Sequence, residues 1–136
     1  MLLDRIRLTA AAKNQIIALK RKTGIEHYNS LCRHAFCISL ANPSVPPKES
    51  FNFNGGLEID WRTFSGGNEA LYLNLLLVRL KHDGMAIDDT TAREMLALHV
   101  HRGLSYLSSR NEDDLLMALS SELASNFREN YPSIDV

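Results

Sequence analysis

The first nine residues alternate between apolar and polar side chains, and this alternation restricts what the chain can fold into. One side of the segment carries Leu2, Ile6 and Leu8, with Asp4 interrupting the row. The other side carries Arg5, Arg7 and Thr9. Because successive side chains of a strand point to opposite faces, the pattern predicts a short strand with one apolar face and one basic face.

Two helices are predicted to follow this strand. Residues 10–23 form an apolar stripe of Ala12, Ile16 and Leu19, and Gly24 then supplies a left-handed C-terminal cap. The second helix spans about residues 27–40 and is apolar around well over half its circumference. Its apolar residues are Tyr28, Leu31, Cys32, Ala35, Phe36 and Ile38. A helix buried that broadly in a short chain usually faces a partner subunit as well as its own core.

The remaining chain predicts a loop, a second strand and more helices. Residues 42–56 contain three prolines, which remove backbone donors and favour a loop. Residues 57–61 alternate again and predict a short strand. Helices are predicted over residues 68–82, 88–108 and 111–127, followed by a frayed tail. The 136 residues therefore predict one compact, mostly α-helical domain, with a DNA-binding unit at 1–109 and a C-terminal helix and tail at 110–136.

The order of strand, helix, glycine turn and helix is typical of a ribbon-helix-helix unit. In that motif two chains pair their strands antiparallel, and the resulting ribbon enters the major groove of DNA. The predicted first strand has no evident partner in its own chain. The pattern therefore predicts an oligomer as well as contact with DNA.

Charge is distributed unevenly along the chain. Residues 1–34 contain seven Lys or Arg and two acids, a net charge of +5, whereas the rest of the chain carries −6. DNA responds to a local basic patch rather than to the average charge, although a basic helix end is also explained by the helix dipole. The sequence lacks an apolar run long enough for a membrane span, and its start lacks the apolar stretch of a signal peptide. Only two cysteines are present, so we expect a cytoplasmic protein.

Catalytic and metal-binding patterns are weak. Cys32 and Cys37 are five residues apart, which is poor spacing on a helix for a disulfide or a shared metal, and core packing explains them better. His99 and His101 would point in nearly opposite directions on a helix and could not share a metal. Trp61 is interpreted as a core residue. We therefore expect no catalytic residues, no metal and no cofactor, and we expect that the protein is not an enzyme.

Three segments together resemble the DndE family of the bacterial DNA phosphorothioation system. They are RIRLTAAAKNQIIALKRKTGIEHYNSLCRHAFCISL, PPKESFNFNGGLEIDWRTFSGG and HVHRGLSYL, and the resemblance covers residues 1 to about 108. It implies a mostly helical fold related to ribbon-helix-helix proteins, and a tetramer that binds duplex DNA, preferably nicked, through surface lysines. It also implies partners among the other Dnd proteins of the sulfur-transfer complex and no assigned catalytic residues.

Two basic surfaces are candidates for contacting DNA. The helix surface carries Lys13, Lys20, Arg21 and Lys22, and the strand surface carries Arg5 and Arg7. We favour the helix lysines, because a preference for a nick is a preference for shape rather than for a base pattern, and Arg5 and Arg7 would then be interface residues. Two alternatives stay open: a ribbon-helix-helix transcriptional regulator, and a protein-binding adaptor of the sulfur-transfer machinery.

Overall fold

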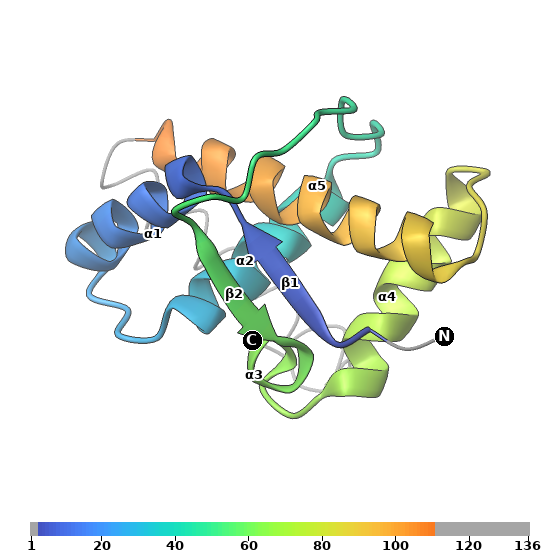
Figure 1. Cartoon of the computed structure of the whole chain (residues 1–136), viewed down its shortest axis with the longest axis horizontal. Coiled ribbons are helices and arrows are strands. Elements are labelled where there is room, and N and C mark those ends of the chain that lie inside the picture. The colour runs from blue at the N-terminus through green and yellow to red at the C-terminus, as the bar shows by residue number, and fades with distance from the viewer. Residues whose placement is uncertain (1–2, 111–136) are drawn as a thin grey trace, which may run out of the picture.

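A computed structural model shows the fold and describes residues 3–110. Along the chain its elements are β1 (Arg5–Leu8), α1 (Ala10–Thr23), α2 (Tyr28–Ala41), β2 (Leu57–Asp60), α3 (Trp61–Ser65), α4 (Glu69–His82) and α5 (Asp89–Ser108). In Figure 1 the strand pair lies in front of α2, with α1 to its left, α5 above it and α4 to its right. The described residues form a mostly helical single domain that begins with a strand, as the sequence predicts. The helix expected over residues 111–127 lies outside the described residues.

The first strand finds its partner within the same chain. β1 pairs antiparallel with β2, with Arg5 opposite Asp60 and Leu8 opposite Leu57. The prediction that this strand lacks a partner in its own chain is therefore wrong. The loop before β2 returns the chain to β1 at Gly56, where an added Cβ would lie 1.8 Å from the carbonyl oxygen of Leu8. Only glycine allows this close approach of two backbones.

The second strand is shorter than predicted because a helix begins inside the expected segment. The Asp60 carboxylate accepts a hydrogen bond from the backbone N–H of Thr63 at 3.1 Å and one from its hydroxyl at 2.6 Å. This is the N-cap geometry that starts a helix. α3 therefore begins at Trp61, which was expected to be the last residue of the strand. Trp61 is buried and stacks on Phe64 at a centroid distance of 5.4 Å, which confirms it as a core residue.

The ends of α1 follow the sequence prediction. The Thr9 side chain accepts a hydrogen bond from the backbone N–H of Ala12, and Gly24 has a φ of 73°. The apolar stripe of this helix is fully buried. The helix predicted over residues 68–82 is α4, and the side chain of Asn68 before it makes no capping hydrogen bond.

The broad apolar surface of α2 is covered by the chain itself. α5 makes the largest contact with α2, and α1 and α3 contact it as well. The two helices approach closely where Gly103 meets Ala35, because an added Cβ on Gly103 would lie 1.8 Å from the Ala35 carbonyl oxygen. The breadth of the apolar arc is therefore explained within the described residues, without the partner subunit that we expected from it.

Two arginines, the buried Arg79 and the half-buried Arg102, hold the loop after α2. Arg79 donates to the carbonyl oxygens of Leu40, Asn42 and Ser44, each at 2.8 Å. Arg102 donates to the carbonyl oxygens of Ser39 at 2.7 Å and Ser44 at 2.8 Å. Carbonyl groups at a helix end lack partners within the helix, so these guanidinium groups satisfy acceptors that would otherwise be unpaired.

His99 lies beside this arginine pair and is fully buried. Its Nδ1 atom lies 2.7 Å from the Ser39 hydroxyl oxygen, which also accepts a hydrogen bond from Arg102 Nε at 2.8 Å. Burial lowers the pKa of His99 to about 4, and the nearby positive charges of Arg79 and Arg102 add to this effect, which the negative charge of Asp83 opposes. His99 is therefore neutral in the folded protein at neutral pH.

We expect the free energy of unfolding to fall as the pH is lowered from about 6.5 to about 4. In this window the unfolded chain binds a proton at His99 and the folded chain does not, so acid favours unfolding by up to about 1.4 kcal/mol per pH unit for each such group. Denaturant unfolding at several pH values should show a shallower pH dependence for His99→Gln than for the wild type. The same substitution at the exposed His27 is the control, and an equal slope for His99→Gln and the wild type would contradict the assignment.

Candidate nucleic-acid interface

One side of α1 gathers cations around an exposed apolar side chain. The buried stripe of α1 fixes its orientation, and helical geometry then places Lys13, Lys20 and Arg21 on one side with Ile17 among them. Lys13 and Lys20 are half-buried, Arg21 is exposed, and Ile17 is 51% exposed. None of the ion pairs that the structure gives for residues 3–110 involves these three cations. Within the part of the chain that the structure describes, no carboxylate neutralises these cations.

Lys22 points to a different side of the helix. It follows Lys20 by two residues, which corresponds to a rotation of about 200°. Lys20 turns toward α2, where its Nζ atom lies 5.8 Å from the ring centroid of Tyr28. Lys22 lies on the same side of α1 as Gln15. The side-chain amide of Gln15 donates to the Ser105 hydroxyl of α5, so this side of α1 faces α5. The KRK sequence is therefore spread around the end of α1 and does not form a single patch.

The strand arginines are partly neutralised. The Nε atoms of Arg5 and Arg7 lie 3.3 and 3.4 Å from the same carboxylate oxygen of Glu58 on β2. The guanidinium of Arg7 also lies over the ring of Phe53, with Cζ 4.8 Å from its centroid. Both arginine side chains are about half exposed. β1 has the predicted basic face, but the Glu58 carboxylate of the same chain lies between its two arginines.

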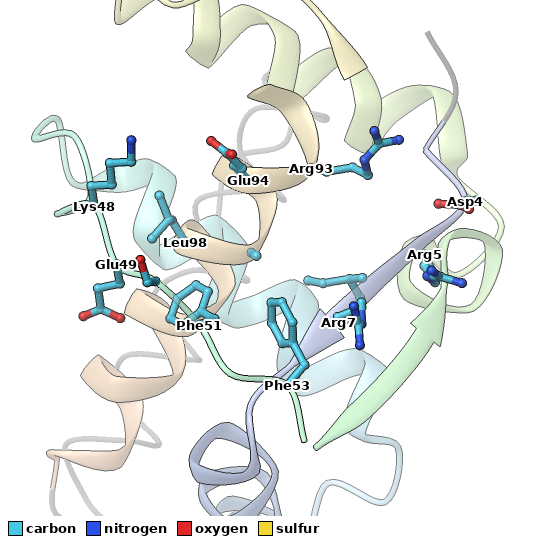
Figure 2. A pocket seen from close by; sticks show the side chains of 13 residues that line it. Asp4, Arg5, Arg7, Lys48, Glu49, Phe51, Phe53, Arg93, Glu94 and Leu98 are labelled. Atoms are coloured by element: carbon cyan, nitrogen blue, oxygen red, sulfur yellow. The ribbon is translucent and has the colours of Figure 1, made fainter. Parts of the chain in front are cut away.

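A cavity of about 600 Å³ opens between β1, the loop before β2 and the first half of α5. Figure 2 shows Arg5 and Arg7 on one side of it, Phe51 and Phe53 at the loop, and Arg93 and Glu94 on the helix. Lys48 and Glu49 also line it. No sequence pattern indicates this site, because its residues come from three distant segments that carry no shared motif. Its rim mixes both signs of charge and so differs from the basic side of α1.

The described residues offer little for covalent or metal chemistry. Burial raises the pKa of the Cys32 thiol to about 12, against a smaller opposite effect of Arg33, so this cysteine is a poor nucleophile. His101 accepts the backbone N–H of Thr9 through Nε2 at 3.1 Å, while its Nδ1 lies 2.7 Å from the Ala97 carbonyl oxygen. His99 and His101 thus have separate partners. Within residues 3–110 no cluster of three metal-ligating side chains occurs, and no helix is long and apolar enough to cross a bilayer.

Comparison with known proteins identifies the family. Residues 5–114 match the family described as DNA sulphur modification protein DndE. Among solved structures, the chain is similar to the crystal structure of DndE from Escherichia coli B7A, described as involved in DNA phosphorothioation modification. The two share 26% sequence identity with a TM-score of 0.66, over 79% of this chain and 98% of that chain. None of the curated proteins compared matches this sequence. The match over most of the chain shows that this protein belongs to the DndE family of the DNA phosphorothioation system.

Proposed function

We propose that the protein is a non-catalytic DNA-binding subunit of the phosphorothioation complex, which works with other Dnd proteins. It binds duplex DNA, preferably nicked, through backbone phosphates. The observation that carries the proposal is the side of α1 where Lys13, Lys20 and Arg21 lie together without carboxylate partners among the described residues. Lysines and arginines that neutralise phosphates release counterions, which gives strong binding without sequence reading.

The alternative of an operator-reading regulator is less well supported. A ribbon that reads bases needs free side chains on the outer face of its strands. Here Glu58 lies between Arg5 and Arg7, and the ribbon is completed by β2 of the same chain. This arrangement favours an interface role for the two arginines over contact with bases.

We also propose that the protein acts as a homo-oligomer, and the resemblance to DndE suggests a tetramer. Because β1 pairs within the chain, the ribbon no longer accounts for self-association. α4 offers another surface, since Leu71, Leu75 and Val78 follow one another along one side of this helix and remain exposed. A second copy that covers this stripe would remove it from water. Sedimentation velocity measures the number of copies.

Replacing Lys13, Lys20 and Arg21 together with alanine is expected to weaken binding to nicked duplex roughly 100-fold at physiological salt, because about three phosphate contacts are lost. The slope of log affinity against log salt concentration should fall by about three. Fluorescence anisotropy with a labelled nicked duplex measures both.

The matched control replaces Arg62, Lys81 and Arg110 with alanine, which changes the net charge equally and leaves the groove beside β1 intact. We expect this control to lose much less affinity than the α1 variant. Equal losses in the two variants would show that total charge rather than α1 governs binding, and would contradict the assignment.

A further inference from the structure

The outer edge of β1 presents unpaired backbone groups. The backbone N–H of Trp61 donates to the carbonyl of Asp4, so in the given register Ile6 and Leu8 form the hydrogen-bonded pairs with β2. The N–H and C=O groups of Arg5 and Arg7 must therefore point away from β2. Among the described residues, no backbone hydrogen bond is made to these outward groups. Within residues 3–110, β1 thus keeps a free edge suited to a further strand.

This free edge faces a groove and not open solvent. Thr9 continues the same alternation, and its outward N–H donates to His101 Nε2 on α5. The outer edge of β1 therefore faces α5. Nearer the start of α5 the two elements separate, and the cavity of about 600 Å³ lies between them, with Ala97 and Leu98 along its helix wall. Figure 2 shows Phe51 and Phe53 on the loop that lines the groove between β1 and α5.

The size and lining of this groove fit a peptide. Binding cavities for ligands commonly measure about 300–1,000 Å³, with an apolar lining and a few polar groups that orient the ligand. Here Phe51, Phe53 and Leu98 supply apolar surface, and charged side chains form the rim. The outward amides of Arg5 and Arg7 supply the main-chain hydrogen bonds by which an added strand is held.

The charges beside the free edge indicate what the added strand carries. Arg5 and Arg7 share the carboxylate of Glu58, so two cations lie against one anion at this edge, while the acidic groups of the groove, Asp4, Glu49 and Glu94, make no ion pair with either arginine among the described residues. Side chains that lie opposite one another on neighbouring strands are stabilised by opposite charge and destabilised by like charge. A strand with acidic residues at alternate positions would face the two arginines favourably.

We propose that this groove binds an extended peptide segment of a partner protein, which adds to β1 as a third strand and places acidic side chains opposite Arg5 and Arg7. A second copy of β1 is a poorer occupant. The antiparallel register that pairs the outward amides of Arg5 and Arg7 in both copies would set arginine against arginine. The proposal concerns protein docking, so it is independent of DNA binding by α1.

Two-dimensional NMR of the ¹⁵N-labelled full chain tests the proposal with three probes. The first is a capped six-residue peptide that alternates valine and glutamate, the second replaces glutamate with lysine, and the third is a six-nucleotide single-stranded DNA. We expect the glutamate peptide to shift the amide signals of Arg5 and Arg7 and to slow their hydrogen exchange. The lysine peptide and the oligonucleotide should leave these signals unchanged.

Two substitutions then locate the binding mode. Arg7→Pro removes an outward N–H without removing a hydrogen bond to β2, and should weaken binding of the glutamate peptide roughly tenfold. Arg7→Gln keeps the N–H and loses only the charge, so its effect should be smaller. Ala97→Phe fills the groove from α5 and should also block binding of the glutamate peptide. This variant tests the proposal if Arg7→Pro does not fold.

Several results would overturn the proposal. If neither peptide shifts the amide signals of Arg5 and Arg7, or if both peptides shift them equally, the groove does not bind an acidic strand. Shifts of the Arg5 and Arg7 amides by the oligonucleotide alone would assign the groove to nucleic acid. Unchanged peptide affinity in a folded Arg7→Pro variant, or in Ala97→Phe, would show that the peptide does not add to β1.

Discussion

Replacing Gly103 with alanine is expected to destabilise the fold by about 3 kcal/mol or more. The added Cβ would lie 1.8, 2.3 and 2.6 Å from the carbonyl oxygen, carbonyl carbon and Cα of Ala35. These are backbone atoms of α2, so the contact cannot be relieved by turning a side chain. α2 and α5 would have to separate along the largest helix contact of the domain. Denaturant or thermal unfolding measures the loss, which is a large share of the stability of an ordinary domain.

Two further variants make this expectation specific. Glu94→Ala, at an exposed position of the same helix, should change stability by no more than about 0.5 kcal/mol. Adding Ala35→Gly to Gly103→Ala should not restore stability, because the clash involves backbone atoms that glycine retains. A Gly103→Ala variant as stable as the wild type would show that the two helices do not approach as closely as described.

Replacing Arg79 with methionine is the second change with a large expected effect, about 3–5 kcal/mol of lost stability. Arg79 Nε pairs with the Asp83 carboxylate at 2.8 Å, and the side chains of both residues are buried, at 8% and 3% exposure. The substitution removes the arginine partner of that carboxylate, which keeps only the contact with His82 among the ion pairs of residues 3–110, and it also removes the donors to three carbonyl groups at and after the end of α2. Burial alone would raise the pKa of Asp83, but the hydrogen bonds from Arg79 and His82 lower it below its usual value. Equilibrium unfolding in urea measures the effect.

The neighbouring groups provide the controls for Arg79. Methionine at the exposed Arg62 should be nearly neutral. Asp83→Asn combined with Arg79→Met should recover part of the loss, because the uncompensated buried charge is removed. If Arg79→Met costs no more than Arg62→Met, the arginine does not hold the loop as the structure indicates.

The N-terminal elements could be predicted from sequence because their signals are local. The alternation of Arg5 to Leu8, the apolar stripe of α1 and the glycine after it each act over a few residues, and the structure has all three. The pairing of β1 with β2 could not be predicted in this way. It depends on a loop that brings residues 57–60 back across more than forty positions of the chain. A short strand gives no local indication of its partner, so the ribbon-helix-helix pattern suggested a second chain.

Of the candidate binding surfaces, the one on α1 could be predicted from local sequence, whereas those beside β1 could not. Helical spacing placed Lys13 and Lys20 on one side of α1, and the orientation of the buried stripe agrees with that placement. Glu58 between Arg5 and Arg7 was not foreseen, because the cross-strand register that brings it there is a tertiary property. The groove beside β1 was missed for the same reason, since Lys48, Phe53 and Arg93 become neighbours only in the folded chain.

A binding titration tests the central claim most directly. The purified full chain is titrated against intact, nicked and single-stranded DNA of one sequence, at two salt concentrations. The account predicts the tightest binding for nicked duplex, little dependence on sequence and a steep loss of affinity with salt. Absence of binding to all three forms at physiological salt would contradict a DNA-binding subunit and would leave protein docking as the role of the chain.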